Sequence, residues 1–571
     1  MLVNISEMKL AAARTAESEK FLTSLQNYLQ LTISYSILLF KYIVLSVLLV
    51  LLASHETANP KIGKSNFEFY STEFRQAFLA AASKNDSSLS ELLNNEFYVQ
   101  RQFMPAWTLN FQTNEDFETL KDLIEKANHY GLFPSQYHYS ELVELKEKLE
   151  GDGPDEYKMT ARYQLESLAT EAGFNFMINL ALGVGISDSS LIQSTFVSQL
   201  PQYLNNLITS GNLREGILAV QPDNEQYKRL QSGLVKFLTS TVLYKDDYTI
   251  KQLKGNENLV TQILLKQGYL IPDFANDSAA LISAIRNFQR TNALRPTGEI
   301  NRPTIKALTI STSKKFYQIA MNLDRIRKDV LKKSRYIFVN IPEFKLHYYD
   351  EEGNRSDFPV VVGKTETPTP LVSSQVEHII ANPFWTVPRS ITMNEILPRL
   401  KHDTTYLERN GFMVIDNFEN QIDVSSFNWK TLNADDFKYW FRQKNSRKNA
   451  LGVIKFLFPN DYSVYLHDTP SKSYFEKEFR AYSHGCIRVK NPEKLAEKIL
   501  KDDQQTSEIN LKKMISDKEH KDISLENPLP IFIRYNTCSA DSAGNVYFYP
   551  DIYAEDDAAI QQFVANTSRP L

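Results

Sequence analysis

Residues 464–489 read VYLHDTPSKSYFEKEFRAYSHGCIRV and contain Cys486, one of only two cysteines in the chain, together with His467 and His484. A thiol beside an imidazole is a recurrent nucleophile arrangement, in which the thiolate attacks while the histidine takes and returns the proton. Gly485 directly precedes the sulfur and permits a sharp turn, because glycine adopts backbone angles that a side chain forbids. Successive N–H groups at such a turn can stabilise an oxyanion. The stretch therefore predicts a nucleophilic cysteine exposed at a tight turn.

The flanking residues place this turn among regular elements. Val464, Tyr465 and Leu466 are typical of a strand that ends at His467. After the turn, Asn491, Pro492 and Glu493 form a helix start signal, and an apolar helical face follows at Leu495, Ala496, Ile499 and Leu500. The predicted site thus lies at the ends of strands, where catalytic groups are commonly found.

Two strings resemble a known family. His467-Asp468-Thr469, followed by residues 483–489 (SHGCIRV), is similar in residue identity, order and spacing to the signature of the YkuD-type L,D-transpeptidases of bacterial cell walls. Further strings resemble the same catalytic domain: VNIPEFKLHYY, VVVGKTETPTP, IANPFWTVPRSI and NALGVIKFLFPN. In papain-like and NlpC-type peptidases the cysteine precedes its histidine, which is the opposite order.

The resemblance implies a reaction. The thiolate attacks the carbonyl of the third residue of a tetrapeptide stem of peptidoglycan, D-alanine leaves, and an acceptor amine resolves the thioester into a 3→3 cross-link. The residues alone support only acyl transfer through a thioester, and they do not distinguish an amine acceptor from water. No cofactor or metal is expected.

The expected roles follow from this reaction. Cys486 is the nucleophile and His467 the general base, then the acid that protonates the leaving amine. The backbone of Gly485 and Cys486 is expected to form the oxyanion hole, with His484 orienting the loop. Ser483 and Tyr465 are expected to support the site as hydrogen-bond donors.

Arg488 lies two residues from Cys486, so on a strand both side chains face the same way. It is expected to bind a substrate carboxylate, and a salt bridge within the domain is the alternative. A neighbouring imidazolium or the Arg488 cation is expected to increase the ionised fraction of the thiol.

Two other classes of function stay open at this point. A zinc-dependent or cysteine cell-wall hydrolase could use His467, Asp468, His484 and Cys486, although no HExxH or paired CxxC spacing supports a zinc site. A non-enzymatic peptidoglycan-binding protein would rest on residues 258–310 alone.

Length and composition predict a multidomain α+β chain. It has 571 residues, of which 42% are hydrophobic and 23% charged, with a net charge of −4. Three or four globular domains are expected, and scattered basic residues predict no nucleic-acid partner. Residues 67–243 predict a helical scaffold domain. Residues 258–310 resemble a small three-helix peptidoglycan-binding domain, and residues 335–555 predict the mostly-β catalytic domain.

The N-terminal part predicts export. Residues 1–32 are polar and suggest no function, whereas residues 33–53 are almost wholly apolar and about long enough to span a bilayer. Lys41 interrupts this run, so a membrane anchor and a cleaved signal segment both fit, with the anchor favoured. The expected location is the cell envelope, at the periplasmic face of the inner membrane, with the chain anchored or exported.

Residues 397–447 form a long insertion rich in charge and aromatic residues. Long segments beside an active site often act as lids, and an ordinary surface subdomain is the alternative. Trp429, Tyr439 and Trp440 are the expected substrate contacts in such a lid.

Overall fold

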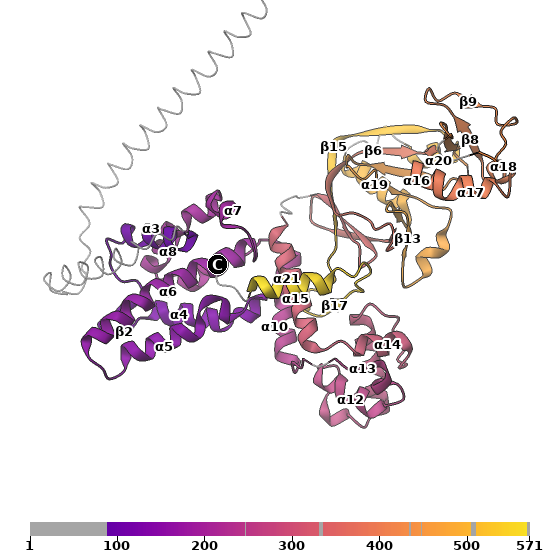
Figure 1. Cartoon of the computed structure of the whole chain (residues 1–571). Helices are drawn as coiled ribbons and strands as arrows, with labels where there is room; N and C mark the ends of the chain where they lie inside the picture. Colours follow the sequence, from indigo (N-terminus) through magenta and orange to yellow (C-terminus); the bar gives the residue numbers. More distant parts are fainter. Residues whose placement is uncertain are drawn as a thin grey trace, which may run out of the picture. The chain divides into compact units, whose positions relative to one another are not determined.

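The computed structural model describes residues 88–245, 247–329, 335–432, 436–446, 448–503 and 510–567. A helical N-terminal half precedes a mostly-β C-terminal half, as predicted (Figure 1). The predicted membrane segment, residues 33–53, lies outside these residues. Among the described helices, none is both long and apolar enough to cross a membrane.

The helical region is built around one long central helix, α6 (Asp155–Leu182), which is buried along most of its length. Glu166 of α6 is fully buried and accepts hydrogen bonds from the N–H groups of Ala106 and Trp107 and from the Tyr98 hydroxyl. These bonds compensate the cost of burying the carboxylate and fix the chain that follows the first described helix. The surrounding helices are α3 (Leu89–Gln100), α4 (Glu115–Glu125), α5 (Tyr139–Glu150), α7 (Asp188–Ile192), α8 (Thr195–Ser210), α9 (Leu213–Ala219) and α10 (Glu225–Ser240).

A separate small core with four described helices forms in the stretch that was predicted to be a three-helix domain. Its helices are α11 (Ile250–Leu253), α12 (Glu257–Lys266), α13 (Ser278–Thr291) and α14 (Arg302–Leu308). Buried Gln289 donates to Glu299 O and Thr304 Oγ1, at 2.9 Å each, and thereby ties the last two helices together. Leu253 of α11 belongs to the core, so the domain begins before the predicted residue 258. Helix α15 (Thr312–Lys328) then leads to the β-rich half.

The main sheet of the β-rich half has nine strands in the order β13-β5-β14-β12-β11-β6-β15-β3-β4. The first half of β5 also pairs with β4, while its second half pairs with β14 and β13, so β5 links the two ends of the sheet. The strands are β3 (Tyr336–Asn340), β4 (Lys345–Tyr349), β5 (Arg355–Gly363), β6 (Val372–Ala381), β11 (Ile454–Leu457), β12 (Leu466–His467), β13 (Ala481–Ser483), β14 (Ile487–Val489) and β15 (Lys521–Arg534). Helices α19 (Pro492–Asp502) and α20 (Leu511–Ser516) contribute apolar residues to the same core.

The chain beyond β15 leaves the main sheet. Among the described strands, β17 (Val546–Phe548) pairs only with β16 (Cys538–Ala540). This hairpin packs against α10, where a Cβ on Gly233 would lie 2.9 Å from the Val546 side chain. The last helix, α21 (Asp556–Thr567), inserts Phe563 into the helical core. The C-terminal segment therefore joins the β-rich half to the helices.

The insertion is a folded subdomain with its own apolar core and a four-stranded sheet in the order β7-β10-β8-β9. Its strands are β7 (Trp385–Thr386), β8 (Phe412–Ile415), β9 (Gln421–Ile422) and β10 (Trp440–Gln443), and its helical turns are α16 (Arg389–Ile391), the π-helical η4 (Thr392–Ile396), α17 (Leu397–Leu400) and α18 (Tyr406–Arg409). Because β7 and Val387 belong to this unit, it begins before the predicted residue 397.

Candidate active site

Cys486 lies in the turn between β13 and β14, as predicted. Gly485 has a φ of +108°, a conformation that a side chain would strain. The Ser483 hydroxyl accepts from the Gly485 N–H at 3.2 Å and donates to the Cys486 carbonyl at 2.5 Å. The Thr369 hydroxyl donates to the Gly485 carbonyl at 2.8 Å. The turn is thus held from both sides, and Ser483 shapes its backbone rather than facing outward.

The oxyanion hole needs a backbone donor that is not already used. The N–H of Gly485 bonds to Ser483 Oγ, so of the two predicted donors the Cys486 N–H is the better candidate.

His467 ends β12, which pairs in parallel with β14 so that His467 lies opposite Arg488. Its Nδ1 is hydrogen-bonded to the Asp468 carbonyl oxygen. A carbonyl only accepts, so Nδ1 must carry the proton and Nε2 keeps its lone pair. Burial, reinforced by the Arg488 cation, lowers the pKa of His467 to about 3. The imidazole is therefore neutral at physiological pH and can act as a base through Nε2.

The thiol of Cys486 is half-buried, and burial raises its pKa. Hydrogen bonds from Tyr465 and the charges of Lys455 and Arg488 oppose this effect. The sequence-based expectation that Arg488 favours the thiolate is right in direction, but the effect of burial is larger. The Cys486 thiol and the His467 imidazole are consequently both neutral at rest.

Lys455 was not singled out from the sequence. It lies directly opposite His467 in the β11–β12 register, and its Nζ is 4.0 Å from the centre of the Tyr465 ring. The resemblance covers the string that contains Lys455, yet no local pattern marks this residue. Only the strand pairing brings its charge to the thiol.

Arg488 projects from β14 with its guanidinium 5.6 Å from the centre of the Tyr474 ring. Its Nε is buried and has no hydrogen-bond partner in the described part of the chain. No ion pair of Arg488 is found among the described residues, so the alternative of an internal salt bridge is not supported there. A guanidinium whose Nε has no hydrogen-bond partner fits an anionic ligand.

His484 contacts the insertion. Its Nε2 lies 2.5 Å from Oε1 of Glu395, which belongs to the π-helical turn η4. The residue that precedes the Gly485 turn is therefore held by a carboxylate from the insertion.

The predicted insertion contacts occupy different environments. Trp429 is only 6% exposed and packs on Phe427 and Phe437 inside the subdomain core. Tyr439 is half-buried against Phe427, and the Trp440 indole donates to Asn417 Oδ1 at 3.1 Å. These contacts give Trp429 a structural role and leave little of it for a ligand.

Asp468 is also used by the fold. Its carboxylate accepts from the Val453 N–H at 3.1 Å and pairs with Lys472. Within the described ranges, no three His, Cys, Asp or Glu side chains are gathered as a metal site requires.

Comparison with known proteins agrees with this geometry. Residues 334–509 match the model of the L,D-transpeptidase catalytic domain named YkuD, and residues 93–234 match a scaffold domain. The chain carries a YkuD-type L,D-transpeptidase catalytic domain.

A Haemophilus influenzae protein named "Putative L,D-transpeptidase" is 32% identical to the chain over 283 residues. The match covers 48% of the chain and 57% of that relative, so the chain spans little more than half of its length. The YkuD-type domain contains Cys486, His467 and the insertion, and the scaffold match covers the helices from α3 to α10.

Proposed function

We propose that the chain is a cysteine-dependent L,D-transpeptidase that cross-links peptidoglycan stem peptides. The proposal rests on Cys486 at its glycine turn, directly before β14, and on a neutral His467 at the end of the neighbouring strand β12, whose Nε2 keeps its lone pair. The matched catalytic domain names the reaction class.

The reaction is derived in two halves. His467 Nε2 takes the thiol proton as the Cys486 sulfur bonds to the carbonyl carbon of the third stem residue, and the Cys486 N–H faces the developing oxyanion. The C–N bond then breaks, and the imidazolium returns the proton to the departing D-alanine amine. A thioester is left on Cys486.

In the second half an acceptor amine attacks the thioester carbonyl. His467 takes a proton from the amine, the C–S bond breaks, and the thiolate regains a proton to regenerate the resting pair. Burial raises the pKa of Cys486, so the thiol keeps its proton at neutral pH and His467 must assist both proton transfers. Replacing His467 should slow both halves of the reaction by about two to four orders of magnitude.

Arg488 and Lys455 are proposed to bind carboxylates of the stem. Both are cations close to Cys486, and the Arg488 Nε has no partner in the described structure. We also propose that the enzyme works in the cell envelope, held there by residues 33–53, because its substrate is outside the cytoplasm.

Intact-protein mass spectrometry of the full chain after incubation with a purified tetrapeptide stem tests the proposal. The wild type should gain the mass of the stem less D-alanine, and Cys486→Ala should gain nothing. Cys538→Ala is the matched control and should still be acylated, because Cys538 is 1% exposed and bonded to Gln318 O. An acylated Cys486→Ala protein would overturn the proposed nucleophile.

A further inference from the structure

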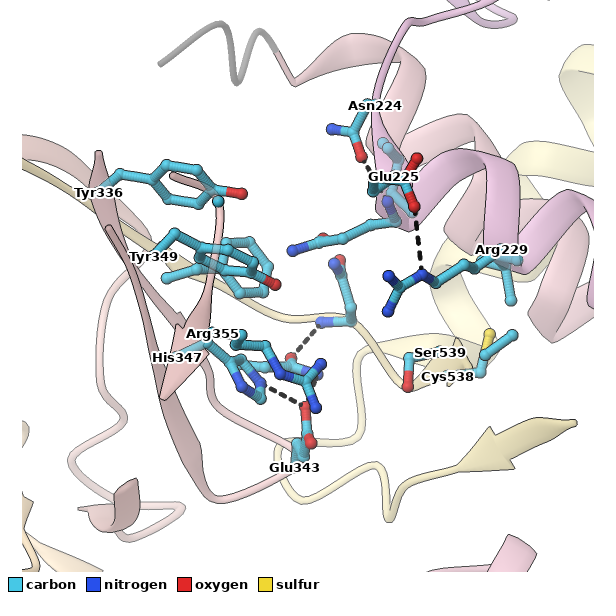
Figure 2. A pocket seen from close by; sticks show the side chains of 18 of the residues that line it. Asn224, Glu225, Arg229, Tyr336, Glu343, His347, Tyr349, Arg355, Cys538 and Ser539 are labelled. Atoms are coloured by element: carbon cyan, nitrogen blue, oxygen red, sulfur yellow. Dashed lines mark hydrogen bonds and ion pairs between the residues drawn. The ribbon is translucent and has the colours of Figure 1, made fainter. Parts of the chain in front are cut away.

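A second cleft, of about 350 Å³, lies apart from the Cys486 turn. Its walls come from the start of α10, the β3–β4 hairpin and β16, and the described residues that line it do not include Cys486 or His467. Figure 2 shows Tyr336 and Tyr349 on one side of this cleft and Asn224, Glu225 and Arg229 on the other. Its volume is at the lower end of the range for small-molecule sites.

The sheet side of the cleft carries an aromatic wall. Tyr336 and Tyr349 are directly opposite each other on β3 and β4, and their rings stack at 4.6 Å with an angle of 18° between their planes. Neither residue is fully buried. The two rings cover each other's inner faces, so the pair presents an outer ring face and the hydroxyl groups at its rim, which suits a ligand with one apolar face and polar edges.

The charged side chains that line the cleft are already paired, either with one another or with a neighbour. Arg229 lies 3.4 Å from Glu225, and Arg355 lies 2.9 Å from Asp357. His347 lies between Glu343 and Asp357, at 3.0 and 2.8 Å. A charged ligand would have to displace one of these pairs and leave a partner uncompensated, so the lining favours an uncharged ligand.

Two amide side chains in the lining have no partner. Asn536 is only 9% exposed; its backbone N–H bonds to Asn340 Oδ1, but its side-chain amide makes no hydrogen bond to any described residue. The Gln226 amide is likewise unbonded within the described structure. Both amides are therefore open to a ligand that supplies donors and acceptors.

We infer that this cleft binds an uncharged saccharide with hydroxyl and acetamido groups, its ring on the Tyr336–Tyr349 pair and its polar groups on Gln226 and Asn536. The inference does not depend on the proposed reaction, although a peptidoglycan enzyme would meet such sugars in the glycan strands. A stem peptide fits less well because its carboxylates would face paired charges.

The test uses the full-length chain and N,N′-diacetylchitobiose, with binding followed by saturation-transfer difference NMR. Weak saturable binding is expected, with a Kd on the order of 1 mM. Gln226→Ala and Asn536→Ala should each weaken binding about three- to tenfold, the effect of losing one neutral hydrogen bond. Gln202→Ala is the matched control, since this exposed glutamine of α8 bonds only to Asn206 among the described residues and should leave binding unchanged.

Cys486→Ala should bind the sugar as the wild type does, which separates this inference from the transpeptidase proposal. Gln226 is half-buried at the start of α10, so its variant should fold even where Asn536→Ala does not. Absence of saturable binding up to about 10 mM would overturn the inference. So would binding that both amide variants leave intact, because the sugar would then occupy another site.

Discussion

Lys455 and Arg488 act on both groups that we propose to react, Cys486 and His467. Each cation lowers the pKa of the Cys486 thiol and that of the His467 imidazole. They therefore favour the thiolate that attacks and disfavour the imidazolium that forms beside it. An anionic substrate that neutralises these two cations would raise the pKa of both the thiol and the imidazole. Substrate binding would therefore change the energetics of proton transfer.

Arg488→Met and Lys455→Met should each raise the pKa of the Cys486 thiol, because each removes a charge that stabilises the thiolate. The rate of alkylation by iodoacetamide, measured against pH, should then rise at a higher pH than in the wild type. Lys490→Met is the control: Lys490 pairs with Glu476 and should leave the profile in place. An unchanged profile in both test variants would show that these two cations do not set the thiol pKa.

The pH dependence of stability offers a check on His467. Its folded pKa of about 3 is below the unfolded value of 6.5, so the unfolded chain binds the extra proton between these values. Stability from this group is complete above pH 6.5 and is lost as the pH falls towards 3. In urea melts from pH 7 to pH 4, His467→Gln should lose less stability than the wild type. An equal loss in both would contradict a neutral, buried His467.

At the scale of elements, the insertion contacts the Cys486 turn through Glu395, whose Oε1 lies 2.5 Å from His484 Nε2. η4 is a π-helical turn, a rare conformation often found at functional sites. Motion of the insertion would therefore be felt at the residue that precedes the Gly485 turn. This contact favours a lid over an independent surface subdomain.

Glu395→Ala should slow acylation of Cys486 by about tenfold, the effect expected when a charged hydrogen bond is removed. Glu395→Gln should lose less, because the amide can still bond to His484. Glu419→Gln removes an exposed ion pair with Arg442 in the same insertion and should not alter the rate. The acylation rates are measured by mass spectrometry with a tetrapeptide stem and with a carbapenem. Equal rates for Glu395→Ala and wild type would exclude an effect of the Glu395–His484 contact on Cys486.

Removing the whole insertion tests the lid itself. The excision must span residues 385–443, because a cut at Leu397 would split the core that includes Val387 and Ile396. With a Gly/Ser linker in place, carbapenem acylation should fall only as far as in Glu395→Ala, whereas stem cross-linking should fall much further. Circular dichroism and thermal melting would establish folding, and equal losses of both activities would make the insertion part of the catalytic scaffold.

At the scale of the whole molecule, Lys315 of α15 lies where three parts of the chain meet. Its Nζ donates to Gln267 Oε1 at 3.0 Å and lies 4.9 Å from the centre of the Phe288 ring and 5.1 Å from that of Phe548. Gln267 and Phe288 belong to the three-helix domain and Phe548 to the C-terminal hairpin. The two rings offset part of the cost of burying the charge.

Burial lowers the pKa of Lys315 to about 7, against an ordinary value of 10.5. The unfolded chain thus binds more protons between pH 7 and 10.5, and the wild type should gain stability as the pH rises through this range, by up to about 1.4 kcal/mol per unit. Lys315→Met has no group that titrates at this position, so its stability should not rise with pH in this way. The free energy of unfolding of Lys315→Met minus that of the wild type should therefore be largest near pH 6 and smaller at pH 10. Chemical denaturation at both values measures the difference, and a constant difference would mean that Lys315 stays charged across the range.

The sequence by itself determined the features that are local in the chain. Cys486, Gly485 and His467 lie within 26 consecutive residues, and a glycine turn and a strand end are set by residues close to them. The helical and β-rich halves likewise follow from hydrophobic spacing along each segment.

Only the tertiary structure decided what depends on strand order and on burial. Lys455 and Glu395 come from distant segments and reach the site through the β11–β12 register and the Glu395–His484 contact. The sequence also did not predict that Trp429 is buried in the insertion or that the β16–β17 hairpin packs on the helices. An aromatic or alternating pattern shows that a segment has an apolar face, but not which other part of the chain covers that face. The raised pKa of Cys486 also depends on the tertiary structure. Burial by the surrounding fold raises this pKa and the charges of Lys455 and Arg488 lower it, and no local sequence pattern shows which effect is larger.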